Sequence, residues 1–347
     1  MGMNDLKKLT LDEGGTIRRQ WFRIGLAGIA GAMFPWVKGY AAPSSQDIQN
    51  YPNRPLRMIS PWAVGGGTEL IGRPLAIGLS KIFGQSVIYE NKPGGGTVIG
   101  SDLVAKAAPD GYTLMITTSA HAINDALIKT LPYSAEQSFA DVAIICKGPM
   151  IIVTKPDSPY KTVKDILAAA KANPGKLTYG SSGNGSAVHL AAELFKLMAK
   201  VDITHIPYKG GGPAHTDLMG GQIDFVFATI AGVAKYIDSG QMRGIAVTSI
   251  SRSTQYPKIP TVAESGVPDY ESEVWYALFT TGGTPQAIVD KLNTATKLVV
   301  NSKEYRNKLE QDGLRIDVGS PKDLTRLIKS DISRWKNVLA VANVTID

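Results

Sequence analysis

Two glycine-rich turns in this sequence have the residue types that bind small anions. The first turn, residues 61–68, follows the apolar segment 56–60, and the second, residues 181–186, follows the segment 177–180. The periodicity after each turn predicts a helix. Glycine lets the backbone approach a ligand closely, and the free N–H groups of a helix's first turn favour negative charge. The two turns are therefore candidate carboxylate sites, although tight strand-to-helix turns with a purely structural role use the same residue types.

Short apolar segments alternate with longer amphipathic segments along most of the chain. Strands are predicted over residues 56–60, 87–90, 113–117, 142–146, 150–154, 176–180, 203–207, 225–228, 245–248 and 275–280. Helices are predicted over residues 71–83, 103–107, 163–172, 187–199, 214–219, 285–301, 305–312 and 321–341. This alternation predicts an α/β fold of parallel sheets with helices on both faces. Because open α/β sheets bind ligands at the carboxyl ends of their strands, the two turns would face each other across a cleft.

The N-terminal segment has the pattern of an export signal. Arg18 and Arg19 precede a short apolar stretch, and small residues follow it. The stretch is shorter than the roughly 20 residues that a membrane-spanning helix requires. Paired arginines are typical of the twin-arginine route rather than the Sec route. We therefore expect residues 1–41 to be a twin-arginine-like signal peptide, cleaved near Ala41 or Ala42, and the mature protein to reside in the periplasm.

Composition excludes several functional classes. After residue 41 the chain has 31 basic and 27 acidic side chains and no dense basic run, so a nucleic-acid partner is not expected. The single cysteine, Cys146, lies in an apolar strand, which excludes a disulfide, and the four histidines lack the spacing of a zinc site. We therefore expect no metal and no cofactor. The mature length of about 306 residues exceeds one ordinary core, which predicts two domains.

Two patterns that enzymes use are incomplete in this sequence. Gly94, Gly96 and Gly100 follow a strand as in a dinucleotide-binding turn, but no acidic residue ends the next strand to hold a ribose. Ser181 and Ser182 lie at a strand-to-helix turn without the glycine spacing of a nucleophile elbow. We expect no catalytic residue, and an exported hydrolase acting on a carboxylate is the enzymatic alternative.

Many turn-forming and other characteristic residues occur in the same order as in one protein family. These residues are Tyr51, Pro52, Arg54 and Pro55, the turn 61–68, Glu90 and Asn91, residues 93–100, 109–114, 131–133, 174–177 and 179–181, Gly185, Ser186 and His189, residues 207–210 and 220–222, and Pro260, Thr261 and Trp275. They resemble the periplasmic receptors of the tripartite tricarboxylate transporters, also called the Bug family. The resemblance covers nearly the whole mature chain.

The resemblance implies a periplasmic-binding-protein-like clamp of two lobes, each a mostly parallel sheet flanked by helices, with the ligand cleft between them. Residues 42–151 and 276–347 would form the first lobe, and residues 152–275 the second. It also implies a protein that captures a small organic or aromatic carboxylate for the integral membrane permease subunits of a tripartite transporter. A ligand-sensing adaptor for a signalling receptor is the alternative with the same fold. No long apolar or heptad surface is evident, so we expect a monomer.

The ligand-binding residues are also implied by the resemblance. We expect them at Pro61, Trp62, Gly66, Gly67, Thr68, Ser119, Ser182, Gly185, Ser186, His189, Tyr208, Ala228 and Thr229. Trp62 is larger than the aromatic residue that the family often has there, which favours a ligand with an apolar or aromatic body. His189 lies three residues after Ser186 on one helix face, where it either contacts ligand or supports the turn. Citrate, dicarboxylates, amino acids, nicotinate and aromatic diacids all stay open as ligands.

Overall fold

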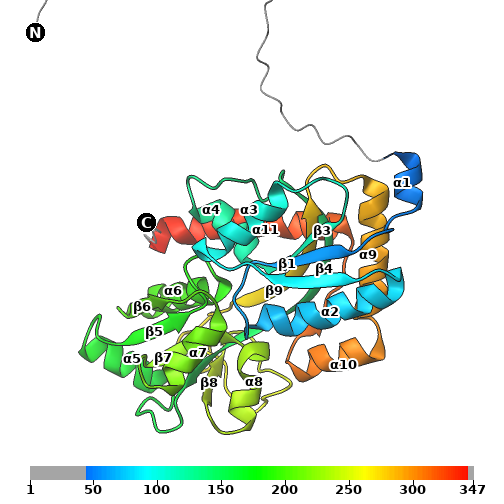
Figure 1. Ribbon diagram of the computed structural model, residues 1–347. Helices are drawn as coiled ribbons and strands as arrows, with labels where there is room; N and C mark the ends of the chain where they lie inside the picture. Colours follow the sequence, from blue (N-terminus) through cyan, green and yellow to red (C-terminus); the bar gives the residue numbers. More distant parts are fainter. Residues whose placement is uncertain (1–43, 343–347) are drawn as a thin grey trace, which may run out of the picture. The chain divides into compact units, whose positions relative to one another are not determined.

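A computed structural model describes residues 44–342 of the chain. The predicted signal peptide, residues 1–41, lies outside the described residues. Ten strands of the described part join in one sheet, drawn in Figure 1. No helix in residues 44–342 combines the length and the apolar character needed to cross a membrane.

The first half of the sheet is built mainly from the two ends of the described chain. Its strands are β1 (Leu56–Ser60), β2 (Val87–Asn91), β3 (Thr113–Thr118), β4 (Phe139–Thr154), β9 (Glu273–Thr281) and the short β10 (Arg315–Ile316). They run in the order β2-β1-β3-β9-β4, and β10 pairs with β4. The β1–β2 and β1–β3 pairs are parallel, whereas β9 is antiparallel to both β3 and β4. We call this part the first half-sheet.

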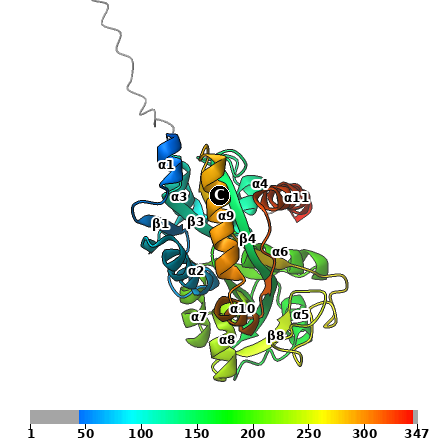
Figure 2. The ribbon, with the colours of Figure 1, turned by 90° about the vertical axis from the view of Figure 1, so that its right-hand side faces the viewer.

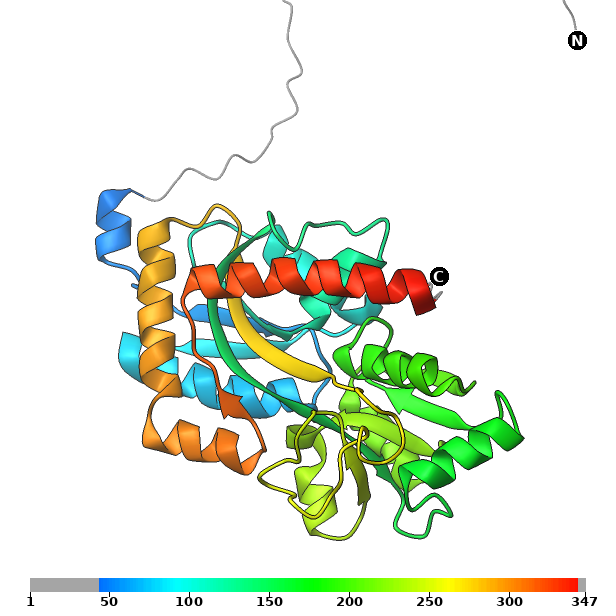
Figure 3. The same cartoon turned by 180° about the vertical axis from the view of Figure 1, so that it is seen from behind.

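Helices cover both faces of the first half-sheet. One face carries α2 (Gly67–Phe83), α9 (Gln286–Val300) and α10 (Lys303–Gln311), and the other carries α3 (Val98–Ala105), α4 (Ala120–Leu127) and α11 (Pro321–Ala342). Successive strand side chains point to opposite faces, so Ile145 packs in the first of these cores and Ile144 in the second. Figure 2 shows α2 and α11 on opposite sides of β4, and Figure 3 shows α11 lying across β4 and β9. The helix α1 (Ser45–Gln49) and the 3₁₀ turn η1 (Gly95–Thr97) complete this part.

The second half-sheet comprises the C-terminal end of β4 and four further strands. These are β7 (Phe225–Thr229), β5 (Thr178–Ser181) and β6 (Thr204–Pro207), in that order from β4, together with β8 (Arg243–Val247), which also pairs with β4. The helices α5 (Val163–Ala172) and α6 (Ala187–Ala199) cover one face, and α7 (Gly211–Met219) and α8 (Ile230–Asp238) cover the other. Alternation again decides the packing, because Phe227 faces α6 while Val226 faces α7 and α8.

The strand β4 runs without interruption through both half-sheets. The sequence predicts two strands here, because Gly148 and Pro149 separate two apolar runs, and this prediction is wrong. Proline has no N–H to donate, but the partners change at this point, from β9 at Pro149 to β7 and β8 immediately afterwards, so the strand continues past it. The predicted lobe boundary at 151/152 lies two residues beyond this change of partners.

A buried threonine ties together the two places where the chain crosses between the half-sheets. The Thr248 hydroxyl accepts the Met150 N–H at 2.7 Å and lies 2.7 Å from the Ser272 carbonyl oxygen, to which it donates. Met150 is the first residue of β4 that pairs with β7, and Ser272 directly precedes β9. We call Thr248, Met150 and Ser272 the crossing junction.

The α/β class that the alternation predicts is confirmed, and the sheet is mixed. The outer strands are parallel, as predicted, in the β1–β2, β1–β3, β5–β6 and β5–β7 pairs. The long strands β4 and β9 are antiparallel to their neighbours within the half-sheets. The chain passes from the first half-sheet to the second along β4 and returns to the first half-sheet at β9. These two strands therefore run in opposite directions.

Candidate functional site

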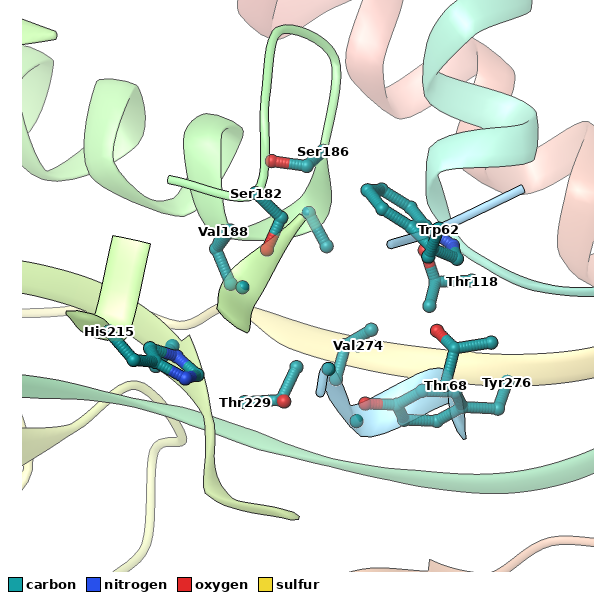
Figure 4. A pocket seen from close by; sticks show the side chains of 15 residues that line it. Trp62, Thr68, Thr118, Ser182, Ser186, Val188, His215, Thr229, Val274 and Tyr276 are labelled. Carbon is teal, nitrogen blue, oxygen red and sulfur yellow. The ribbon is translucent and has the colours of Figure 1, made fainter. Parts of the chain in front are cut away.

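A small cavity lies where the first glycine-rich turn meets the second half-sheet, as Figure 4 shows. Its volume is about 40 Å³. It is lined by Trp62, Gly66, Gly67, Thr68, Thr118, Ser182, Ser186, Ala187, Val188, Gly211, His215, Ala228, Thr229, Val274 and Tyr276. We call it the first pocket. Eight of the predicted residues meet in it, namely Trp62, Gly66, Gly67, Thr68, Ser182, Ser186, Ala228 and Thr229.

The N-termini of four helices converge on the first pocket. The N-cap or first residue of α2, α6, α7 and α8 lines it in each case: Gly66 and Gly67 for α2, Ser186 and Ala187 for α6, Gly211 for α7 and Thr229 for α8. Each helix N-terminus carries the equivalent of roughly half a positive charge together with unpaired N–H groups. Four of them around one cavity make its interior electropositive without any cationic side chain.

Two of these helices begin at side-chain caps that also face the pocket. The Ser186 hydroxyl accepts the His189 N–H at 3.2 Å, and the Thr229 hydroxyl accepts the Gly232 N–H at 3.3 Å. An N-cap hydroxyl fixes the direction of the helix that follows it, and its own O–H group stays available as a donor. The same two hydroxyls therefore position the helices and offer hydrogen bonds to a ligand.

Replacing Ser186 with alanine is expected to lower ligand affinity about tenfold and to destabilise the protein by about 1 kcal/mol, because it removes both the cap and a ligand donor. The matched control is Ser302→Ala, which removes the same kind of cap from α10, outside the pocket. Thermal unfolding should give a similar stability loss for both variants, whereas calorimetric titration should show weakened binding only for Ser186→Ala. Equal affinities in the two variants would remove Ser186 from the binding residues.

Three buried polar atoms around the first pocket have no hydrogen-bond partner within the described residues. They are the indole Nε1 of Trp62, Nδ1 of His215 and the hydroxyl of Tyr276. Unpaired polar groups in a protein interior are costly, and a ligand or an ordered water usually satisfies them. Burial lowers the pKa of His215 to about 4, so the ring is neutral at pH 7, and burial raises the pKa of Tyr276, so its hydroxyl keeps its proton. The pocket thus offers neutral donors.

The first glycine-rich turn is held open toward the pocket by contacts behind it. Gly65 has a φ of 87°, which favours glycine, and its N–H donates to the Glu69 carboxylate at 2.7 Å. The Asn91 side-chain amide donates to the Trp62 carbonyl at 2.9 Å. Glu69 is also paired with Arg73 on the outer face of α2 and does not line the pocket. Its carboxylate therefore stabilises the turn and is not a ligand contact.

The first turn also touches the start of α7, so the two half-sheets meet across the site. The Ala63 N–H donates to the Lys209 carbonyl at 3.3 Å. A Cβ built on Gly212 would lie 2.7 Å from the Val64 carbonyl oxygen. We call the contact between residues 63–65 and residues 209–212 the glycine seam. Only residues without side chains allow the two backbones to come this close.

Five predicted residues lie outside the first pocket. Pro61 and Tyr208 line a second, larger pocket next to it, and the Tyr208 hydroxyl donates to Asp217 at 2.7 Å. Ser119 is buried at the N-cap of α4, one residue after Thr118, which does line the pocket. Gly185 is part of the second turn and His189 lies behind it, and neither lines a pocket. The ligand-contacting role of these five residues stays a prediction.

His189 supports the second turn from behind. Its Nδ1 accepts the Gly185 N–H at 3.3 Å, and its ring stacks on His205 with 4.2 Å between ring centroids. His205 in turn lies 2.7 Å from the Ser181 hydroxyl. Burial is the main cause that lowers the pKa to about 4 for His189 and to about 3 for His205, so both rings are neutral at pH 7. The stacked pair links α6 and β6 to the turn that carries Ser182.

Sequence reasoning missed seven residues of the first pocket. They are Thr118, Ala187, Val188, Gly211, His215, Val274 and Tyr276. The run of three glycines at 210–212, before α7, was a detectable signal, because it repeats the strand, glycine-rich turn and helix pattern of the two recognised turns. It would have led to Gly211 and, one helical turn later, to His215. Val274 and Tyr276 lie in an apolar strand and gave no signal.

Metal chemistry finds no support in the site. No group of three or more histidine, cysteine or acidic side chains in residues 44–342 is arranged to hold a metal ion. The first pocket is lined by one histidine and by no cysteine or carboxylate.

Comparison with known proteins gives a consistent picture. Residues 71–344 match the family model described as the tripartite tricarboxylate transporter family receptor. The solved structure of the periplasmic binding protein BugD is 31% identical, with a TM-score of 0.82 over 85% of this chain and 99% of that chain. At these values the likeness extends to the whole fold of the described chain.

Two further similar structures contain bound acids. A Rhodopseudomonas palustris protein determined with adipate is 34% identical, with a TM-score of 0.82 over 85% of this chain and 99% of that chain. MatC from the same organism, determined with bound malate, is 29% identical, with a TM-score of 0.80 over 83% of this chain and 100% of that chain. Both bound compounds are small dicarboxylates.

Proposed function

This chain belongs to the tripartite tricarboxylate transporter family of receptors, and from that premise we propose that it binds a small carboxylate in the periplasm and delivers it to membrane permease subunits. One observation carries the proposal. The N-termini of four helices surround a cavity that no charged side chain lines. This arrangement favours an anion and disfavours a cation.

The size and chemistry of the first pocket match a carboxylate group. Its volume of about 40 Å³ exceeds the roughly 10–15 Å³ that a cavity needs to hold one water and lies far below the roughly 300–1,000 Å³ of typical whole-ligand sites. A carboxylate accepts about four hydrogen bonds, and the pocket offers backbone N–H groups, the hydroxyls of Thr68 and Ser186, and the unpaired groups of Trp62 and Tyr276. Hydrogen bonds to an ionised group are roughly twice as strong as neutral ones, so neutral donors suffice.

The family and the sequence support the remaining parts of the proposal. Similar proteins bind adipate and malate, and BugD is a periplasmic binding protein. The pattern in residues 1–41 supports export through a cleaved signal peptide. The protein acts as a monomer that catalyses nothing.

Two lobes, residues 42–151 with 276–347 and residues 152–275, enclose the ligand by moving together. The change of strand partners within β4 and the glycine seam across the site support this division. The helix N-termini of both half-sheets already line the first pocket, as a closed clamp around one carboxylate requires.

A thermal-shift screen of residues 42–347 against mono-, di- and tricarboxylates, amino acids and aromatic acids tests the proposal. A ligand present at 100 times its dissociation constant should stabilise the native protein by about 2.7 kcal/mol. Binding of a carboxylate with a stoichiometry of one, and no change in the compound by mass spectrometry, is the expected result. No thermal shift across the panel, together with turnover of a compound in it, would overturn the transport function and favour the hydrolase.

A further inference from the structure

The second pocket is far larger than the first and adjoins it, because the two pockets share lining residues. Its volume is about 750 Å³, within the range typical of small-molecule sites, whereas that of the first is about 40 Å³. Trp62 and Ser182 line both. A ligand whose carboxylate occupies the first pocket must therefore place the rest of its body elsewhere, and the second pocket is the adjoining space.

The charge of the second pocket differs from that of the first. Its lining includes Lys129 and Lys209 and contains no acidic side chain. Both lysines are exposed, and neither side chain has an ion-pair or hydrogen-bond partner within the described residues. Seven other lysines there form ion pairs, Lys147 with Asp317 among them, and most form none. An unpaired cation beside an acid-free pocket attracts an anionic group.

The two lysines come from different half-sheets. Lys129 follows the C-terminal end of α4, next to the first half-sheet, and Lys209 follows β6 of the second. The Lys209 carbonyl also accepts the Ala63 N–H of the glycine seam, so its backbone position depends on contact between the half-sheets. An anion that binds both ammonium groups would connect the same two parts of the chain that the seam connects.

Trp62 separates the two pockets and supplies an apolar surface between them. Its side chain is almost fully buried, and the residue lines both pockets. Figure 4 shows its indole at the edge of the first pocket, beside Thr118. A carbon chain or ring passing the indole would gain dispersion contacts and lose contact with water.

We propose that Lys129 and Lys209 form a second anion site, which binds the far carboxylate of an elongated dicarboxylate whose near carboxylate occupies the first pocket. This inference rests on the proposed function, because it assigns the second end of the same ligand. It identifies the preferred ligand class as dicarboxylates with an apolar spacer long enough to pass Trp62, in preference to monocarboxylates and to compact tricarboxylates.

Matched pairs of ligands test the second anion site. Calorimetric titration of the full protein would compare linear dicarboxylates such as adipate and suberate with monocarboxylates of equal chain length, hexanoate and octanoate. Dicarboxylates of sufficient length should bind at least tenfold more tightly than their partners. Lys129→Gln and Lys209→Gln should each weaken dicarboxylate binding at least threefold, and the double variant about tenfold or more, with monocarboxylate affinity unchanged. The dicarboxylate preference should also shrink as salt is raised.

A third substitution, Lys81→Gln, is the matched control. It removes the same charge from the last turn of α2, outside both pockets, and should leave every affinity unchanged. The inference is overturned if dicarboxylates bind no better than monocarboxylates, or if the double variant keeps the dicarboxylate preference. In both cases carboxylate binding in the first pocket would still support the proposed function. Absence of binding by every acid would instead overturn both.

Discussion

Alanine in place of Gly212 is expected to weaken ligand binding by about tenfold to 100-fold without unfolding the protein. A Cβ at this position would lie 2.7 Å from the Val64 carbonyl oxygen, and its other near neighbours, at 3.7 Å, also belong to Val64 and Gly65. Every atom in conflict thus lies on the opposite side of the glycine seam. An overpacked contact costs about 1–3 kcal/mol, and separating the seam is the simplest way to relieve it.

The same substitution should not harm the second half-sheet itself. Gly212 lies in the first turn of α7, where alanine is a better helix former than glycine by about 1 kcal/mol. The ligand-free protein should therefore unfold at the same temperature or slightly higher, while calorimetric titration shows the loss of affinity. Gly220→Ala, at the opposite end of α7 and 3.4 Å from its nearest neighbour, is the control and should bind normally. Wild-type affinity in Gly212→Ala would contradict closure across the seam.

Lowering the pH from 7 to 5 is expected to destabilise the protein by several kcal/mol. Burial lowers the pKa to about 4 for His121, His189 and His215 and to about 3 for His205. In the unfolded chain a histidine has a pKa near 6.5, so below that pH the unfolded state binds protons that the native state does not. The free energy of unfolding therefore falls as pH falls from about 6.5 toward 4, by up to about 2 kcal/mol for each histidine at pH 5.

Three carboxyl groups act in the opposite direction, because burial also raises the pKa of Asp312 and of Asp331. Burial raises the pKa of Asp141 to about 6, so the native state binds this proton before the unfolded state does, and this group favours folding as pH falls below about 6. Four histidines with lowered pKa values outweigh these three aspartates, and the net effect is a loss of stability. Denaturant unfolding at pH 7 and pH 5 measures it.

His121→Phe is the informative variant for the pH effect, because His121 is fully buried beside Phe139 and Phe279 and lies outside both pockets. It should shrink the difference in stability between the two pH values by about 2 kcal/mol. Equal stability of the wild-type protein at pH 7 and pH 5 would show that the histidines are protonated in the native state.

Most helices and strands could be predicted from the sequence, because capping residues and apolar periodicity indicate the same bounds that packing imposes. The predicted bounds of α5 and α6 agree with the structure, because a capping threonine or serine precedes each amphipathic run. The helices α4 and α8 were missed, since each begins directly after a strand and is only 8 or 9 residues long. The helix predicted at 103–107 is α3, which begins earlier, at Val98, because glycines at 94–96 with positive φ conceal its start.

The pocket residues at glycine-rich turns could be predicted from the sequence, whereas those on the strands of the sheet could not. The two turns led to Gly67, Thr68 and Ser186 because backbone exposure at a strand end has a sequence signal. Tyr276 lies among apolar residues of β9, and its place at the pocket depends on pairing with β4, a contact between residues more than 100 positions apart. Residues chosen by such long-range pairing cannot be found from local patterns.

If the two lobes open as proposed, the crossing junction would make that opening a rotation in which parts near the junction move little and distant parts move further. Thr248 fastens β4 to the segment that leads into β9, so the two crossings cannot slide independently and any swing must pivot near Met150 and Ser272. Thr229 pairs directly with Met150, so the deep wall of the first pocket lies beside the pivot and hardly travels. Lys209 and Val64 belong to the glycine seam, which such an opening would separate. A ligand would therefore first contact the deep wall of the first pocket, which is already formed, and would be enclosed last by the glycine seam. Contacts with the wall would then set the affinity, and contacts at the seam would set the dissociation rate.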